Sequence, residues 1–149
     1  MCGSVTYQFT GIYNSIIEIK SKTDIKSGEP AAKALCHCTD CQKWSGSNYT
    51  SNVGVPRKSF TLLSGKEHLK TFDVTGDSGK INKHYFCSNC GSSLYTELEV
   101  MPEMMFIKAG GLDGGKADLG KVDVELYVKD RVSFLGKVEG AKQDPKMEY

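Results

Sequence analysis

The chain has 149 residues, the length of one domain, and its hydrophobic and charged fractions of 39% and 25% are close to globular averages. Nineteen basic against eighteen acidic side chains leave a formal net charge of +1, so no broad positive field is present to bind phosphate backbones or anionic lipids. The chain contains neither a secretory leader pattern nor a run of about 18 apolar residues. We therefore expect one soluble, cytoplasmic domain over residues 1–149, with no nucleic-acid or membrane partner and with 140–149 as a loosely held tail.

Short β-prone runs recur along the chain, and turn-forming residues separate them. In chain order the predicted strands are 5–10, 16–19, 49–55, 60–63, 81–86, 93–97, 105–109 and 122–128. Helical periodicity is sparse: residues 39–44 are predicted to form a short helix, and 27–35 is a second helix candidate. The pattern predicts a mainly β fold of short antiparallel strands with short helices.

The six cysteines are grouped rather than scattered. Cys36, Cys38 and Cys41 place three thiols in one short segment, close enough to surround a tetrahedral zinc with Zn–S distances of about 2.3 Å. Cys87 and Cys90 form a Cys-x-x-Cys pair followed by a glycine, which can adopt the positive φ of a metal-binding knuckle. Because cytoplasmic thiols stay reduced and a Cys-x-Cys disulfide is strained, the grouping indicates metal binding or catalysis.

Other interpretations of the cysteines stay open. A Cys-x-x-Cys pair can be a thioredoxin-type redox motif, although Cys87 lies between two predicted strands rather than before a helix. A purely structural zinc module is another possibility, but the pairs of a zinc ribbon are about 15 to 20 residues apart. The segment between Cys41 and Cys87 is much longer than that.

The number of cysteines in the first group bears on function. Structural zinc usually has four protein ligands, whereas catalytic zinc has three and an open position. Three thiolates leave zinc with a net charge of about −1, which suits binding and deprotonating a soft thiol better than activating water. The group therefore predicts thiol chemistry, with an incoming thiolate oriented toward an electrophilic carbon.

Several blocks of sequence carry a family resemblance across nearly the whole chain. The blocks are CGSVTY, LCHCTDCQKWSGSNYTSNVGVPRKSFTLLSG, HYFCSNCGSSLYTEL, IKAGGLDGG and ELYVKDRVSFLG. They resemble the glutathione-dependent formaldehyde-activating family, whose zinc domain is shared with a centromere-associated protein and has a β-tent (Mss-four-like) fold. The resemblance implies that fold, zinc stabilisation, and glutathione as a co-substrate.

The resemblance also implies a role for each cysteine. Cys36, Cys38 and Cys41 would hold a catalytic zinc with an open position. A structural zinc would be held by Cys2, Cys87 and Cys90. The family usually opens with a Cys-x-Cys pair, of which Cys2 matches one member, so the fourth structural ligand is left unassigned.

Residues near the first group are further candidates. The segment Trp44, Ser45, Gly46 and Ser47 offers an aromatic wall, amides and hydroxyls to the carboxylate of a peptide-like cofactor, although packing is the more frequent role of a tryptophan such as Trp44. The neighbouring cations that could offset the thiolate charge are Lys43, Arg57 and Lys58.

Two histidines and two departures from the family pattern complete the list. His37 is expected to point away from the metal, and His84 is expected to be a structural histidine, with substrate contact or zinc ligation as alternatives. Glu125 and Phe134 stand where the family commonly has a histidine and a tryptophan.

The sequence therefore leads to one main hypothesis and two alternatives. The main hypothesis is a zinc-dependent carbon-sulfur lyase or synthase that adds glutathione to, or releases it from, a small electrophile such as formaldehyde. The same site could instead convert a larger electrophile by conjugation, elimination, isomerisation or ring opening. The non-catalytic alternative is a zinc-stabilised interaction module.

Overall fold

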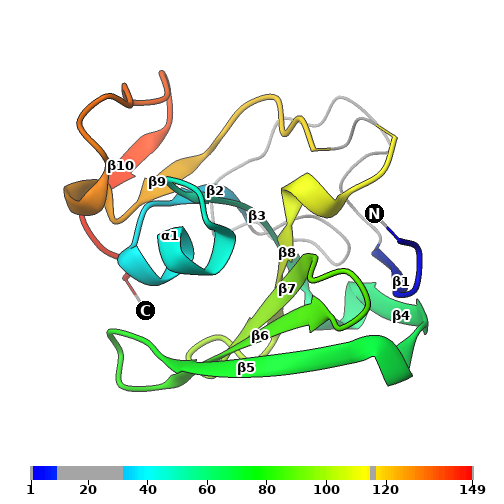
Figure 1. The fold of residues 1–149 in the computed structure, drawn as a ribbon. Coiled ribbons are helices and arrows are strands. Elements are labelled where there is room, and N and C mark those ends of the chain that lie inside the picture. Colours follow the sequence, from blue (N-terminus) through cyan, green and yellow to red (C-terminus); the bar gives the residue numbers. More distant parts are fainter. Residues whose placement is uncertain (1, 10–31, 115–116, 149) are drawn as a thin grey trace.

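The computed structural model describes residues 2–9, 32–114 and 117–148 (Figure 1). The α-helix in this part of the chain is α1 (Thr39–Ser45). The strands are β1 (Thr6–Phe9), β2 (Ala32–Cys36), β3 (Thr50–Pro56), β4 (Phe60–Ser64), β5 (Leu69–Thr75), β6 (Ile81–Cys87), β7 (Ser93–Leu98), β8 (Met104–Lys108), β9 (Val124–Leu126) and β10 (Lys142–Asp144). Short 3-10 turns are η1 (Arg57–Ser59), η2 (Lys66–His68), η3 (Ala109–Gly111) and η4 (Val128–Asp130). No helix in these ranges is long and apolar enough to cross a membrane.

Most strands belong to one large sheet. Its eight strands follow the order β10-β9-β2-β3-β8-β7-β6-β5, and β1 and β4 form a separate antiparallel pair. Neighbours from β2 through to β5 are antiparallel, whereas β9 is parallel to both β2 and β10. The mainly β fold is confirmed, and the two parallel pairs are an addition to the antiparallel strands expected from the sequence.

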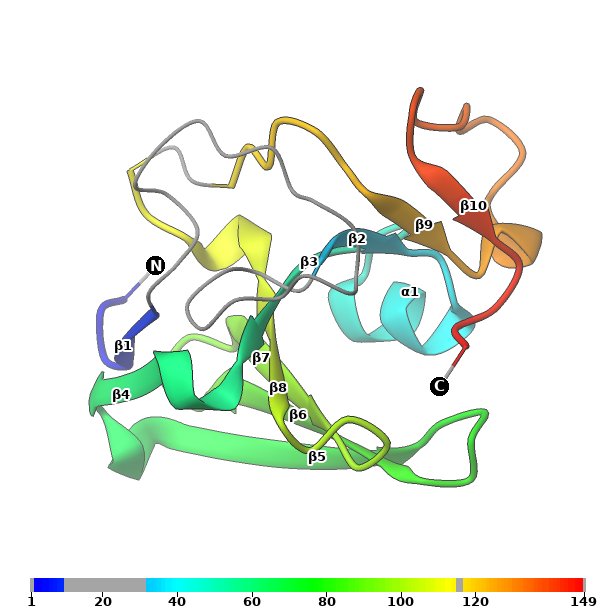
Figure 2. The ribbon, with the colours of Figure 1, turned by 180° about the vertical axis from the view of Figure 1, so that it is seen from behind.

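The large sheet is bent, and α1 lies between its two ends (Figures 1 and 2). Toward the β5 end, Trp44 of α1 packs on His84 of β6 and stacks on Phe72 of β5, with ring centroids 4.6 Å and 6.4 Å away. Toward the β9 end, Gln42 Nε2 donates a hydrogen bond of 3.0 Å to the carbonyl of Asp130. One short helix therefore contacts β5 and β6 on one side and η4, the turn that follows β9, on the other.

The core lies on one face of β3 and β8. Val53, Val55 and Ile107 have no exposed surface, as expected for alternate positions of strands that turn one face inward. Residues that alternate with them along the strands point to the other face, where Asn52 of β3 and Lys108 of β8 are register partners. Strand alternation thus places a polar pair on the face opposite the core.

Three sequence predictions differ from the structure. Residues 32–35, within a helix candidate, belong to β2, because pairing with β3 and β9 on both sides overrides the helix propensity of Ala and Leu. β5 was not predicted, since this edge strand is mostly exposed and carries polar residues. Part of the expected loose tail, Lys142–Asp144, pairs with β9 as β10. The predicted strand 16–19 lies outside the described residues.

Candidate functional site

The structure brings Cys36, Cys38 and Cys41 together in what we call the inner cluster. Their three sulfurs lie within 4.8 Å of one another. Cys36 ends β2, Cys38 caps α1, and Cys41 lies in the first turn of that helix. Sulfurs bound to one tetrahedral zinc at about 2.3 Å would be about 3.8 Å apart, a spacing that this arrangement can provide.

Local backbone chemistry forms the turn that carries these sulfurs. The Cys38 sulfur accepts a hydrogen bond of 3.3 Å from the amide of Cys41, the role usually taken by an oxygen at a helix N-cap. Gln42 Nε2 donates to the carbonyl of His37 at 2.6 Å. The helix ends at Gly46, which adopts the left-handed conformation with φ of 63°. The turn that carries the sulfurs is thus stabilised by hydrogen bonds between its own side chains and its backbone.

A buried ion-pair network anchors the same loop from the far side. His37 Nε2 lies 2.9 Å from Glu125 Oε1, and each side chain has at most 2% of its surface exposed. Glu125 Oε2 accepts from the amide of Val138 and from Gln143 Nε2, both at 2.7 Å, and Arg131 Nη2 lies 3.1 Å away. His37 therefore points toward β9 rather than joining the inner cluster.

The inner cluster concentrates thiols that cannot all ionise without a cation. Hydrogen bonding with Cys38 and Cys41 and burial raise the pKa of Cys36, while the hydrogen bond from Cys36 lowers the pKa of Cys41. Crowded negative charge of this kind is relieved when a dication binds. Soft thiolate donors suit zinc, so the donor set fits the metal that the sequence analysis anticipated.

The buried cation beside the inner cluster is Lys108, which sequence analysis did not select. Only 8% of it is exposed, and its Nζ donates to Asn52 Oδ1 at 2.8 Å. Burial lowers the pKa of Lys108, while the charges of Cys41 and Cys36 oppose that shift. The signal in the sequence was weak: a lysine that ends the apolar strand MMFIK at a position out of step with its core residues.

The cations that sequence analysis did select lie elsewhere. Lys43, Arg57 and Lys58 are exposed. Arg57 forms an ion pair of 2.8 Å with Glu97 and donates to the carbonyl of Pro102. These three are ordinary surface cations, whereas Lys108 is buried and its charge helps to lower the pKa of Cys41.

His84 lies next to Lys108 and is held as a neutral side chain. Its Nδ1 is 3.0 Å from Thr96 Oγ1, and its ring packs on Trp44. Burial, with the Lys108 charge as a second cause, lowers the pKa of His84 to about 4. It is not a member of either cysteine group, so among its expected roles the structural one and substrate contact fit its position.

Two cavities adjoin these residues. The inner cavity has a volume of about 200 Å³, and its lining includes the inner cluster together with Asn52, His84, Thr96, Phe106, Lys108 and Lys129. The outer cavity has a volume of about 470 Å³, and its lining includes Cys2, Tyr7, Trp44, Thr50, Cys87, Cys90, Lys108 and Asp113. Lys108 lines both cavities, so it stands at their boundary.

The structure also brings Cys2, Cys87 and Cys90 together, in what we call the outer cluster. The three sulfurs lie within 4.8 Å of one another, and those of Cys2 and Cys87 are 3.7 Å apart. Gly91 has the expected positive φ, 73°, and its amide donates to the carbonyl of Cys87 at 2.7 Å. Within the described ranges no further His, Cys, Asp or Glu side chain joins this group.

The two ends of the outer cluster differ in environment. Burial raises the pKa of Cys87, whereas a hydrogen bond with Ser92 lowers the pKa of Cys90 to about 6. Cys2 is exposed. Asn89 Nδ2 donates to Ser4 Oγ at 2.8 Å, which ties the segment that carries Cys2 to the knuckle.

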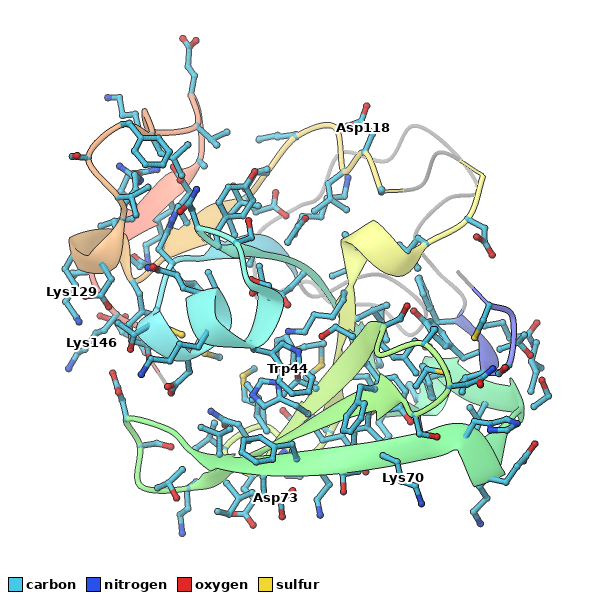
Figure 3. All side chains as sticks on the ribbon, in the orientation of Figure 1. Trp44, Lys70, Asp73, Asp118, Lys129 and Lys146 are labelled. Atoms are coloured by element: carbon cyan, nitrogen blue, oxygen red, sulfur yellow. The ribbon has the colours of Figure 1, made fainter. Side chains whose placement is uncertain are left out.

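The predicted glutathione-binding segment is divided by the structure. Trp44 lies between α1 and the β5–β7 strands (Figure 3) and, with Ser45, lines the outer cavity. Gly46 and Ser47 line neither of the two cavities. The hydroxyl of Ser45 donates to the carbonyl of Cys41 at 2.8 Å and accepts from the amide of Ser47 at 3.2 Å, so this turn largely satisfies itself.

The fold and the site define a bent β-sheet protein with two three-cysteine groups of metal-binding geometry. A sequence model of the family described as glutathione-dependent formaldehyde-activating enzyme matches residues 1–130. The chain belongs to this family, and the resemblance noted in the sequence is confirmed.

Two other comparisons bear on the chain. A crystal structure of a Rhodobacter sphaeroides protein is similar, with 21% sequence identity and a TM-score of 0.55; the match covers 81% of this chain and 92% of that one. At this identity the likeness supports the fold alone. No curated protein matches the chain.

Proposed function

We propose that this protein is a zinc-dependent carbon-sulfur lyase or synthase, in which glutathione binds as a thiolate at the inner cluster and adds to a small electrophile such as formaldehyde. In the reverse direction the same carbon-sulfur bond breaks. The observation that carries the proposal is the convergence of Cys36, Cys38 and Cys41 at the wall of the inner cavity. Three protein sulfurs leave room for a fourth donor from outside the chain.

Zinc held by the inner cluster would supply Lewis acidity that favours the thiolate form of an incoming thiol at neutral pH. The chain's own part is to fix the three sulfurs. Gln42 bonds the loop to η4, and the buried pair of His37 and Glu125 bonds it to β9. Such outer contacts orient metal ligands, and their loss typically costs about 10- to 100-fold in metal affinity or activity.

The sizes of the two cavities suit different parts of the substrates. The inner cavity, about 200 Å³, is smaller than the 300 to 1,000 Å³ usual for ligand pockets, so it suits a thiol end and a small electrophile. The outer cavity is large enough for peptide groups. Tyr7 and Trp44 line this cavity, and Tyr7 Oη and Trp44 Nε1 are buried without a hydrogen-bond partner among the described residues. Burial raises the pKa of Tyr7 to about 12, so both groups are donors that suit a carboxylate or amide oxygen of glutathione.

The outer cluster is proposed as a structural zinc site. Its sulfurs join the segment that carries Cys2 to the turn between β6 and β7. A metal bound there would stabilise the wall of the outer cavity, which all three of these cysteines help to line.

The proposal is tested by metal content, spectroscopy and turnover together. Cys38→Ser is expected to lose the inner metal and at least about 100-fold in glutathione-dependent turnover, measured after subtraction of the uncatalysed adduct formation. In the cobalt-substituted protein, glutathione is expected to change the thiolate-to-metal absorption, because a fourth sulfur enters an open position. Full turnover and full metal content in Cys38→Ser would refute the scheme. If glutathione leaves the thiolate-to-metal absorption of the cobalt protein unchanged, the result would instead favour a closed, non-catalytic zinc module.

A further inference from the structure

Lys108 is a buried lysine whose side chain can donate more hydrogen bonds than its polar neighbour accepts. It is 8% exposed at the end of β8, and Asn52 Oδ1 accepts one of the three hydrogens on its Nζ. Burying a charge is costly unless other charges or dipoles compensate for it. The compensating groups here are the thiols of the inner cluster, whose charges act on Lys108 against the effect of burial.

The position of the ammonium is fixed by its partner. Asn52 Nδ2 donates to both the carbonyl and the hydroxyl of Thr50, at 3.1 Å and 2.9 Å. Because the amide nitrogen is committed in this way, Asn52 Oδ1 is the atom that faces Lys108. The ammonium is therefore held at the boundary of the two cavities rather than free to swing into solvent.

The other basic side chains of the inner cavity, His84 and Lys129, do not supply a second buried positive charge. His84 is neutral near pH 7 because its pKa is lowered to about 4, and its Nδ1 is engaged with Thr96. Lys129 also lines the cavity, but it is paired with Asp130 at 2.9 Å. Lys108 is thus the one buried cation among the described residues that line the inner cavity.

Building on the proposed function, we infer that Lys108 is a catalytic residue that binds the carbonyl oxygen of the electrophile while the thiolate adds to its carbon. As the thiolate sulfur bonds to the carbonyl carbon, the C=O π bond breaks and its electron pair moves to oxygen. The Nζ–H group stabilises that negative oxygen. The proton that the thiol released on binding returns from solvent to the oxygen, so thiol and carbonyl combine without a further reactant.

The physical basis is charge stabilisation in a site of low dielectric constant. A donor that is already oriented toward developing negative charge needs no reorganisation during the reaction, and loss of one such donor typically costs 100- to 1,000-fold in kcat. A simpler role would be neutralisation of the thiolate charge. In that case loss of Lys108 would weaken metal and glutathione binding, and turnover would fall only in proportion.

The test compares Lys108→Met and Lys108→Arg in the zinc-loaded full chain. Lys70→Met is the matched control, because Lys70 is exposed on β5 and lines neither of the two cavities. Metal content, the glutathione titration of the cobalt-substituted protein, and kcat and KM with formaldehyde are measured for each. Where Lys108→Met fails to fold, Lys108→Gln, which can still bond Asn52, replaces it.

Lys108→Met is expected to keep both metals and a glutathione affinity within about threefold, yet to lose about 100-fold in kcat, with partial recovery in Lys108→Arg. An unchanged kcat in Lys108→Met would overturn the role of Lys108 and leave the proposed function standing. A loss of kcat matched by an equal loss of metal content or of glutathione affinity would do the same. Absence of turnover above background in the unsubstituted protein would overturn the proposed function, and the inference with it.

Discussion

The inner and outer clusters each bring three cysteine sulfurs together, but they are built differently. The inner cluster is framed by β2 and α1, and Lys108 supplies a buried positive charge beside it. The outer cluster joins a Cys-x-x-Cys turn to Cys2, which is exposed. Its sulfurs depend on local hydrogen bonds such as that of Ser92 with Cys90.

This difference indicates why two sites of equal sulfur count would serve different ends. Where a network buried on several sides fixes the sulfurs, an additional ligand can be gained or lost without movement of the loop. Where the sulfurs link a chain segment to a turn, the metal itself holds the pieces together. The inner cluster is thus suited to exchange of an outside ligand, and the outer cluster to joining two parts of the fold.

The strongest way to break the comparison is to remove the support behind the inner cluster. Glu125→Ala takes the shared partner from His37 and Arg131 and leaves buried charge unpaired, so we expect a loss of about 3–5 kcal/mol in the free energy of unfolding. Urea denaturation measures the loss, and metal analysis is expected to show weaker binding at the inner cluster alone. Equal weakening at both clusters would mean that the network supports the whole fold rather than the loop.

The same residue gives the expected dependence on pH. Burial acts to raise the pKa of Glu125, but hydrogen bonds from Gln143, the Val138 amide and His37 outweigh it and lower that pKa below 4.5. A carboxyl group with a depressed folded pKa stabilises the protein fully above its unfolded pKa, and the contribution is lost as the pH falls through the folded value. Acid destabilisation below about pH 4.5 should therefore be less steep in Glu125→Gln, a variant that cannot titrate there.

A second test sharpens the contrast in exposure. Because Cys2 is open to solvent, a chelator is expected to remove metal from the outer cluster at least about 10-fold faster than from the inner one. Release from the zinc-loaded protein should then follow two phases, detected with a coloured zinc indicator. Cys2→Ala should abolish the fast phase and spare the slow one. A single phase in the unsubstituted protein would show that exposure of one ligand does not distinguish the clusters.

Local pattern and long-range pairing account for what the sequence could and could not predict. The three-cysteine loop, helix 39–44 and the positive φ of Gly91 follow from neighbouring residues, and all three are present. β2 was mistaken for helix because its identity depends on β3 and β9, which are distant in the chain. β5 was missed for a different reason. This edge strand is mostly exposed, so its sequence lacks the alternation of apolar and polar residues that predicts a strand.

The polar residues of the site were harder to predict than its cysteines. Lys108 ends an apolar strand, and nothing nearby in the sequence shows that it faces the inner cluster. Glu125 was noticed as a departure from the family pattern, but its partners His37, Arg131 and Gln143 come from three separate segments. Phe134, the other departure, is 74% exposed and contributes no buried packing at the position where the family commonly has a tryptophan.

The smallest expected effect compares the glycines that shape the two clusters. Gly91 in the outer knuckle and Gly46 at the end of α1 both adopt positive φ, 73° and 63°, and a Cβ atom would meet nothing within 4 Å at either position. Alanine at each should therefore cost only the conformational penalty, about 1–2 kcal/mol. Because Gly91 shapes the turn that holds two sulfurs, its substitution should also speed metal release from the outer cluster. Gly46→Ala should lower stability by a similar amount while release from both clusters stays unchanged, since Gly46 follows the inner sulfurs without orienting them.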